Sequence, residues 1–255
     1  MITAASTKLY DAAYLDRMRP FLWPLKARSF SLLGPLVAKR IADIGCGTGD
    51  DAYHFAREGA EIYAVDHDLS LITAAKAKRS APLPFILADA AQLPFPDASL
   101  DVIRFDRVLQ HVQHREGICR EAFRVLRDGG LLQVIDPDYE SWSFFLECRS
   151  LERKLLEAVS HRRIPHAHAV RNLPALVLAC GFLVEGVEGY STLVKDRDFA
   201  CSIIRFDRVF EELRESKSLS QEELAAWQEL MTRPAPQFNL SLQFQILQAR
   251  RPART

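Results

Sequence analysis

The sequence has few cysteines, no excess of charge of either sign and no long apolar run. Its five cysteines are odd in number and contain no Cys-x-x-Cys pair, so we predict neither a disulfide framework nor a metal site and expect a reducing, cytoplasmic setting. The 33 basic and 33 acidic residues balance, which argues against a nucleic-acid partner. No stretch reaches the roughly 18 apolar residues of a membrane span. The N-terminus also lacks the basic patch and apolar core of a signal peptide.

The remaining composition is that of an ordinary globular protein. With 255 residues, of which 48% are apolar and 26% charged, the chain is long enough for one large α/β domain or two small ones. Seven short apolar segments are predicted to be strands: 39–44, 61–66, 84–89, 101–106, 131–136, 183–192 and 238–251. Segments with helical patterns lie between them: 50–59, 70–80, 115–130, 149–163, 173–182, 202–215 and 220–231.

Local signals refine several of these boundaries. Ser70 is predicted to be the N-cap of its helix, and the helix that begins near residue 115 is expected to end at Gly129. Ser220 and Glu223 have the spacing of a capping box. The segment 8–37 is expected to form short helical pieces, separated by the prolines at positions 20, 24 and 35.

The alternation of strands and helices predicts an α/β fold with a doubly wound, Rossmann-like parallel sheet and helices on both of its faces. Right-handed crossovers place the carboxyl ends of parallel strands along one edge of the sheet, where ligands usually bind. No Gly/Ser-rich linker or internal repeat interrupts residues 1–255. We therefore expect a single domain.

A glycine-rich turn follows the first predicted strand, in the stretch "IADIGCGTGDD" at 41–51. A dinucleotide site needs the pattern Gly-x-Gly-x-x-Gly with a pyrophosphate at the helix N-terminus. Here Gly45, Gly47 and Gly49 alternate strictly, and Asp50 stands where a pyrophosphate needs positive potential. No Gly-Lys-Ser/Thr of a Walker A loop follows. The turn is therefore predicted to hold a ligand other than a pyrophosphate.

Acidic residues end the next two predicted strands as well. Asp66 ends the second strand, twenty-one residues after Gly45, at the spacing where a carboxylate accepts hydrogen bonds from ribose hydroxyls. Asp89 ends the third, and with the backbone of Ala90 it could recognise an adenine ring. Because the three strands share one sheet edge, these acids are expected to lie near one another.

These motifs together resemble the class I S-adenosylmethionine-dependent methyltransferases, in particular the small-molecule branch of the ubiquinone/menaquinone-biosynthesis type. The likeness rests on "IADIGCGTGD", "YAVDHD", "LADAAQLPFPDASLDVIRFDRVLQHV" and "REAFRVLRDGGLLQVID", and it is strong over residues 38–136. It implies a seven-stranded, mostly parallel sheet whose last strand is antiparallel. It also implies an N-terminal helical cap at 1–37, a cofactor-binding core at 38–136, an inserted helical lid at 137–172, and a C-terminal part of the sheet with a helical insertion at 173–255.

The resemblance implies that S-adenosylmethionine is the cofactor, and it assigns residues to the parts of that molecule. The glycine loop would wrap the methionine part, the acid of the second strand would hold the ribose, and the acid after the third would contact adenine. The N-terminal segment would close over the cofactor. The implied cofactor-binding residues are Tyr14, Arg17, Asp43, Gly45, Cys46, Gly47, Asp66, His67, Asp89, Ala90, Asp106 and Arg107.

No strong catalytic motif accompanies this site. The cofactor carries an activated methyl group, so the protein mainly has to orient the reactants. Some acceptors also need a general base. The candidates that follow the fourth strand, follow the fifth strand or lie in the predicted lid are His111, Asp138, Tyr139 and His166. His166 and His168 form a His-x-His pair, but no third metal ligand is evident.

The sequence therefore predicts methyl transfer to oxygen, nitrogen or carbon of a small molecule. Two alternatives stay open. The protein could bind the same cofactor and catalyse a cyclisation or elimination without methyl transfer, or it could be a nicotinamide-dependent oxidoreductase, which Asp50 argues against. The expected partner is a small-molecule acceptor, with neither nucleic acid nor membrane, and a homodimer is an open possibility.

Overall fold

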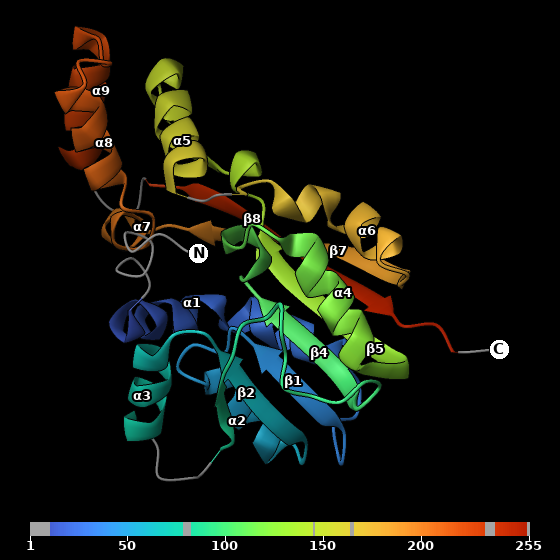
Figure 1. Ribbon diagram of the computed structural model, residues 1–255. Coiled ribbons are helices and arrows are strands. Elements are labelled where there is room, and N and C mark those ends of the chain that lie inside the picture. Colours follow the sequence, from blue (N-terminus) through green and yellow to red (C-terminus); the bar gives the residue numbers. More distant parts are fainter. Residues whose placement is uncertain (1–10, 79–82, 145, 164–165, 233–237, 254–255) are drawn as a thin grey trace.

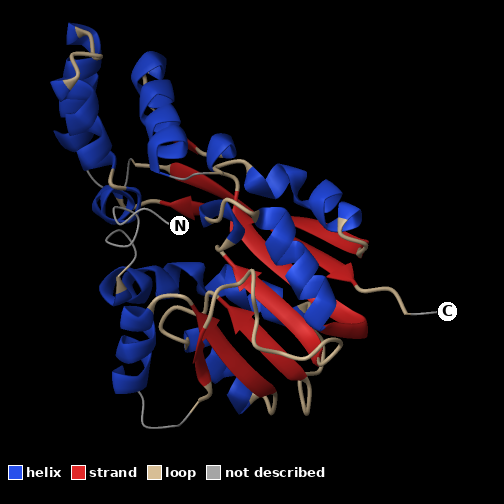
Figure 2. Ribbon diagram, in the orientation of Figure 1, coloured by secondary structure: helices blue, strands red, loops and turns tan. Residues whose placement is uncertain are grey.

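A computed structural model describes residues 11–78, 83–144, 146–163, 166–232 and 238–253. Eight strands in this part of the chain form one continuous sheet with helices on both sides (Figure 2). The strands are β1 (Arg40–Ile44), β2 (Glu61–Asp66), β3 (Phe85–Leu87), β4 (Leu100–Asp106), β5 (Leu126–Pro137), β6 (Ser143–Phe144), β7 (Leu183–Val194) and β8 (Leu240–Arg250).

The sheet has the order β3-β2-β1-β4-β5-β8, and both β7 and the two-residue β6 pair with β8. The first five strands are parallel, and β8 runs antiparallel to its neighbours. The expected fold class is therefore confirmed: the seven predicted strands are all present, and β6 is a short addition. The carboxyl ends of β1, β2 and β4 meet at one edge, as the doubly wound topology requires.

The helices are α1 (Ala12–Ser31), α2 (Asp50–Arg57), α3 (Leu69–Lys78), α4 (Arg115–Val125), α5 (Arg149–Arg163), α6 (Ala169–Ala179), α7 (Arg197–Ile204), α8 (Phe206–Glu215) and α9 (Gln221–Thr232), with short 3-10 turns η1 (Leu109–His111) and η2 (Tyr139–Ser141). Helices α4 and α6 pack on one face of the sheet, and α1 and α2 cover the other. Helices α5, α8 and α9 stand away from the sheet, at the upper left of Figure 1. A shared apolar cluster joins them to β8 and to α1.

The expected break of the N-terminal segment is wrong at Pro20 and Pro24, whereas the helix does end before Pro35. Helix α1 runs without interruption through Pro20 and Pro24. Both prolines lie on its exposed side, whereas Leu22, Leu25 and Phe30 are buried against the rest of the protein. Burial of this face stabilises the helix by more than the lost backbone hydrogen bonds cost.

Several helix boundaries also differ from the sequence expectations; among them, the helix expected at 173–182 is α6, Ala169–Ala179. Helix α3 begins before Ser70, and the Asp68 carboxylate accepts the backbone N–H of Ser70 at 2.8 Å, so Asp68 serves as the cap. Helix α4 ends at Val125 because residues 126–130 already belong to β5. The helix expected at 202–215 is split into α7 and α8 at Arg205, which has a left-handed backbone.

The capping box predicted for α9 is present. The backbone N–H of Ser220 donates to Glu223 Oε2 at 2.8 Å, and the backbone N–H of Glu223 donates to Ser220 Oγ at 3.2 Å. Burial raises the pKa of Glu223, but hydrogen bonds from Lys154 and from this cap outweigh it and lower the pKa to about 2. The cap therefore stays ionised over the physiological range.

Candidate active site

The glycine turn between β1 and α2 has the backbone that its sequence suggests. Gly45, Gly47 and Gly49 all have positive φ, at 72°, 56° and 71°, a region that glycine reaches without steric cost. A Cβ atom on Gly45 would lie 2.5 Å from Val108 Cγ2, and one on Gly47 would lie 2.8 Å from Leu15 Cδ1. The turn is therefore packed closely against α1 and the segment after β4.

Asp66 links the end of β2 to this turn. Its carboxylate accepts the backbone N–H of Gly47 at 2.8 Å through Oδ2 and that of Asp68 at 2.9 Å through Oδ1. The neighbouring His67 ring lies 3.4 Å from Oδ1 and is exposed. Asp66 itself is 5% exposed. A carboxylate held by two backbone amides has a fixed orientation, which suits recognition of a hydroxyl pair.

The residues predicted to contact adenine lie on the far side of the same edge. Asp89 follows β3, is exposed, and accepts the backbone N–H of Ala91 at 2.8 Å. Ala90 is half-buried beside it. Cys46 donates its backbone N–H to Val65 at 3.0 Å, and burial raises the pKa of its thiol far above the ordinary value. The Cys46 thiol is therefore uncharged; it lines the turn and does not act as a nucleophile.

Beneath the turn lies a buried network of charges that the sequence expectations did not include. Arg104, in the middle of β4, is fully buried and pairs with Asp51 at 2.8 Å and Asp106 at 3.0 Å. Lys26 of α1 contacts the same two carboxylates, at 2.6 and 2.9 Å. In the sequence, the only sign of this network is Arg104, a charged residue inside the apolar segment "DVIRFD". A buried strand normally excludes an unpaired cation, so such a residue indicates buried partners.

Asp43 is the third carboxyl group of this network and the least neutralised. It stands opposite Arg104 in the pairing of β1 with β4, but its contact with that guanidinium is the longest, at 3.3 Å. Burial is the main cause that raises the pKa of Asp43 to about 7; Arg104 opposes this rise and Asp51 adds to it. Asp106 shows the opposite balance: burial raises its pKa, but Lys26, Arg107 and Arg104 outweigh it and hold the pKa well below its usual range.

The N-terminal residues implied by the resemblance lie over the same edge. Tyr14 and Arg17 are on the first turns of α1, and Arg17 is exposed. Burial raises the pKa of the Tyr14 hydroxyl, while the nearby Arg107 and Arg17 lower it. Arg107 donates from Nε to Asp106 at 3.0 Å. The structure therefore brings the N-terminal helix, the glycine turn and the end of β4 together.

Two of the four candidate bases meet in the segment after β4. His111 is in η1, and its Nε2 lies 3.0 Å from Gln110 Nε2. Burial, then Arg107 and His67, lower the pKa of His111 to about 4, so it is neutral at physiological pH. His166 donates its backbone N–H to Gln110 O at 3.2 Å, and its buried ring Nε2 has no hydrogen-bond partner in the described part of the chain. Burial, then Arg115 and His168, lower its pKa.

Asp138 and Tyr139 follow β5 on the same side. Asp138 is buried; Oδ2 accepts from Arg171 Nε at 2.8 Å, and Oδ1 has no partner among the described residues. The Tyr139 ring packs against Trp142, with centroids 4.2 Å apart, and its backbone N–H donates to Ala167 at 3.1 Å. The loop after β5 and the segment before α6 thus form one layer above η1.

Asp136 in β5 is a buried acid that sequence reasoning missed. It is fully buried, and neither carboxyl oxygen has a hydrogen-bond partner of normal geometry in the described part. Burial, assisted by Asp106, raises the pKa of Asp136 well above its ordinary value, while Arg107 and the backbone amides of Leu109 and Gln110 oppose the rise. The acid that ends "LLQVID" therefore lies buried beneath η1, in surroundings that favour its protonated form.

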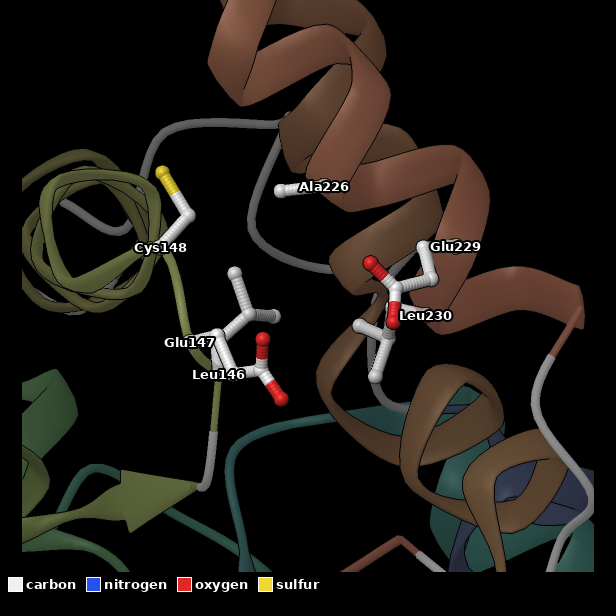
Figure 3. Close-up of a pocket in the computed structure, with 6 residues that line it drawn as sticks. All are labelled: Leu146, Glu147, Cys148, Ala226, Glu229 and Leu230. Carbon is white, nitrogen blue, oxygen red and sulfur yellow. The ribbon is translucent and has the colours of Figure 1, made fainter.

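Two surface hollows outlined by the described residues lie away from this edge. One is a small gap between the start of α5 and helix α9, lined by Leu146, Glu147, Cys148, Ala226, Glu229 and Leu230 (Figure 3). The other lies beside the ends of α4 and α6 and includes Arg120, Arg124 and Arg251, each of which is paired with a carboxylate. No group of three or more His, Cys, Asp or Glu residues in the described part is arranged to hold a metal.

A parallel sheet of this order, with a glycine turn and strand-end acids at its carboxyl edge, defines a Rossmann-like cofactor-binding protein. A family model described as a methyltransferase domain matches residues 42–134. Over this region the chain is similar to S-adenosylmethionine-dependent methyltransferases, among them enzymes of ubiquinone and menaquinone biosynthesis.

Curated relatives match this region. An uncharacterized 37.1 kDa protein in transposon Tn4556 of Streptomyces fradiae is 30% identical over 172 residues, which are 65% of this chain and 50% of that protein. The ubiquinone/menaquinone biosynthesis C-methyltransferase UbiE of Dinoroseobacter shibae is 36% identical over 111 residues, 41% of this chain and 44% of that protein. The chain thus spans about half the length of the curated relatives it matches.

Solved structures share the fold at lower identity. The YcgJ protein of Bacillus subtilis has a TM-score of 0.63 and 19% identity, covering 89% of this chain and 100% of that one. The cyclase SpnF has a TM-score of 0.53 and 22% identity, covering 86% of this chain and 77% of that one. A phosphoethanolamine N-methyltransferase of Haemonchus contortus with this fold was solved with S-adenosyl-L-methionine. S-adenosylmethionine is the cofactor of this family.

No helix in the described part of the chain combines the length and the apolar character needed to cross a membrane.

Proposed function

We propose that this chain transfers the methyl group of S-adenosylmethionine to an oxygen, nitrogen or carbon atom of a small molecule. The observation that carries the proposal is the single edge at which Asp43, the glycine turn, Asp66 and the end of β4 meet. Gly47 and Asp66 are joined there by a 2.8 Å hydrogen bond. The family match over residues 42–134 supports the same reading.

The proposed cofactor residues divide by the part of the molecule that they would hold. Asp43, Gly45, Cys46 and Gly47 would surround the methionine part, because a buried carboxyl and a close backbone turn suit a cationic amino acid. Asp66 and His67 would hold the ribose, and Asp89 and Ala90 the adenine. Asp106, Arg107, Tyr14 and Arg17 would enclose the cofactor from β4 and α1.

The cofactor, when bound, supplies a methyl group activated by a positively charged sulfur. This chain's residues would then orient the acceptor for in-line attack and exclude water, and placement alone is worth several kcal/mol. His111 is neutral at pH 7 and could accept a proton from an acceptor hydroxyl or amine. Asp138, Tyr139 and His166 are the other candidates to touch the acceptor.

The proposal is tested by supplying S-adenosylmethionine and fractionated small-molecule extracts to the purified protein. Formation of S-adenosylhomocysteine that depends on one fraction, together with a product heavier by one methyl group, supports it. Asp66→Asn should reduce this turnover at fixed cofactor concentration, whereas the exposed Arg120→Met on α4 should not.

A second candidate function is a reaction other than methyl transfer, catalysed with the same cofactor bound. The structural likeness to the cyclase SpnF is the observation that keeps it open. Consumption of an acceptor fraction without formation of S-adenosylhomocysteine would favour it. A nicotinamide-dependent oxidoreductase is less well supported, because the family match is to a methyltransferase domain and Asp50 occupies the N-terminus of α2.

We further propose that residues 1–255 act as one domain, with 38–136 as the cofactor core, 1–37 as a cap over it, and 137–172 as a lid over the acceptor. The hydrogen bond from the backbone N–H of His166 to Gln110 O, at 3.2 Å, joins the proposed lid to η1 and supports its placement. Residues 173–255 would complete the sheet and carry the insertion α7–α9. A homodimer stays a prediction, which light scattering of the purified chain would test.

A further inference from the structure

Arg107 has an unusual backbone conformation. It directly follows β4 and has a φ of 59°, a left-handed conformation that is costly for a residue with a long side chain. Its backbone N–H donates to Ile135 O at 2.7 Å, which holds it there. Residues with strained backbone angles concentrate at ligand sites. The backbone of Arg107 therefore suggests that this residue contacts a ligand.

The positive charge of Arg107 is less neutralised than that of its neighbours. Lys26 and Arg104 each pair with Asp51 and with Asp106. Arg107 pairs with Asp106 alone in the described part of the chain, so three cations share that one carboxylate. Only Nε of Arg107 donates to it, and the two terminal nitrogens have no hydrogen bond among the described residues.

Asp51 also acts on Arg107: its charge raises the pKa of the guanidinium, without a direct ion pair between the two side chains. Burial raises the pKa of the nearby Asp136 well above the ordinary value, which favours its uncharged form. His111 is neutral, and Arg17 on α1 contributes another positive charge near the Tyr14 hydroxyl. The Arg107 side chain is 20% exposed, so it borders the edge where ligands are expected. A partly exposed guanidinium with two free donor groups matches a carboxylate, which it can bind through two hydrogen bonds.

We propose that the Arg107 guanidinium binds a carboxylate, either that of the methionine part of the cofactor or one carried by the methyl acceptor. This inference rests on the proposed function, because both ligands belong to that reaction. It gives the side chain of Arg107 a role in selecting a ligand by charge. Arg107 would hold the ligand and take no part in bond making.

The first experiment tests the cofactor as the source of the carboxylate. S-adenosylhomocysteine and its decarboxylated analogue would be titrated into the wild type, Arg107→Met and Arg107→Lys, with Arg120→Met as the control. If the cofactor carboxylate is the ligand, Arg107→Met weakens S-adenosylhomocysteine binding by roughly ten- to hundredfold, the size expected for a lost hydrogen bond to a charged group. Binding of the decarboxylated analogue stays unchanged, and Arg107→Lys recovers part of the loss.

The second experiment tests the acceptor as the source. Thermal unfolding of the S-adenosylhomocysteine-saturated proteins would be followed with benzoate and with benzamide, which differ in charge and little in shape. If an acceptor carboxylate is the ligand, benzoate stabilises the wild type and Arg120→Met but not Arg107→Met, and benzamide stabilises none of them. Circular dichroism and the unfolding midpoint without ligand check that each variant is folded.

The proposal is overturned if Arg107→Met binds both nucleosides with wild-type affinity and is stabilised by benzoate as much as the wild type. Failure of the proposed function gives a different result, namely that the wild type does not bind S-adenosylhomocysteine. The benzoate comparison can be repeated without the nucleoside, so it still tests Arg107 in that case.

Discussion

At the scale of single residues, the buried cations decide how the candidate site is organised. Arg104 is the largest fully buried side chain of the described part, and it reaches carboxylates from β1, α2 and β4. Lys26 brings α1 to two of the same carboxylates. The cofactor edge and the N-terminal helix are therefore held by one set of charges, whose members depend on one another.

We expect Lys26→Met to destabilise the protein by roughly 3 kcal/mol, because it leaves buried carboxylates with too little positive charge. Arg28 is a matched control on the same helix, since it pairs with Glu188 at the exposed surface, where an ion pair contributes little. Urea unfolding of both variants measures the difference. Equal midpoints for Lys26→Met and Arg28→Met would show that the buried network does not stabilise the fold.

The buried Asp43 predicts that cofactor binding depends on pH. Because its pKa is raised to about 7 in the ligand-free protein, a cationic amino group that binds beside it must displace a proton below that pH. Affinity for S-adenosylhomocysteine should therefore rise as pH increases from 5.5 toward about 7 and level off above it. Titration calorimetry across this range tests the trend, and Asp43→Asn should bind more weakly with a flat profile. An unchanged slope in Asp43→Asn would assign the dependence to another group.

At the scale of elements, the glycine turn depends on both its backbone angles and its close packing. Gly45 and Gly34 have similar positive φ, at 72° and 65°. A Cβ on Gly45 would lie 2.5 Å from Val108 Cγ2, whereas a Cβ on Gly34 would meet nothing within 4 Å. The two positions separate the cost of the backbone angle from the cost of the contact.

Gly34→Ala should cost about 1 kcal/mol, the usual penalty for a side chain at positive φ. Gly45→Ala should cost more, because the stiff β-branched Val108 has to move, and it should also weaken cofactor binding. Thermal unfolding and nucleoside titration of the two variants test this. Equal losses of stability, with cofactor affinity unaffected in both, would contradict the close packing of the turn.

Elements with strong periodicity could be predicted, and those governed by distant contacts could not. The strand segments and the capping box of Ser220 and Glu223 follow from local patterns, which the structure preserves. Helix α1 crosses Pro20 and Pro24 only because its other side is buried, and no local pattern reports that burial. The end of α4 at Val125 is set by pairing of Leu126 with Leu100 across β4 and β5, which also acts at a distance.

The candidate site shows the same limit. Positions at strand ends are local, so the placing of Asp43, Asp66 and Asp106 at one edge could be expected from the topology. The partners of these acids come from α1 and from the middle of β4, far away along the chain. Lys26 gave no signal, and Arg104 gave only the weak one of a charge inside an apolar strand. The raised pKa of Asp136 likewise follows from its tertiary surroundings.

At the scale of the whole molecule, the parallel core and the outer helices are proposed to have separate functions: the core binds the cofactor, and the outer helices select the acceptor. The core from β1 to β5 carries most of the proposed cofactor residues, and the match to a methyltransferase domain covers residues 42–134. Helices α5, α8 and α9 lie outside that match and share an apolar cluster with β8. Acceptor choice is expected to depend on this less recognisable part, which agrees with the limited length over which the curated relatives align.

The central claim is that the carboxyl edge of this sheet binds S-adenosylmethionine through Asp66, and calorimetric titration with S-adenosylhomocysteine tests it most directly. The wild type should bind with a dissociation constant in the micromolar range, as is common for enzyme ligands. Asp66→Asn should bind roughly ten- to hundredfold more weakly, because it loses charged hydrogen bonds to the ribose. No binding by the folded wild type, or equal binding by Asp66→Asn, would contradict the account.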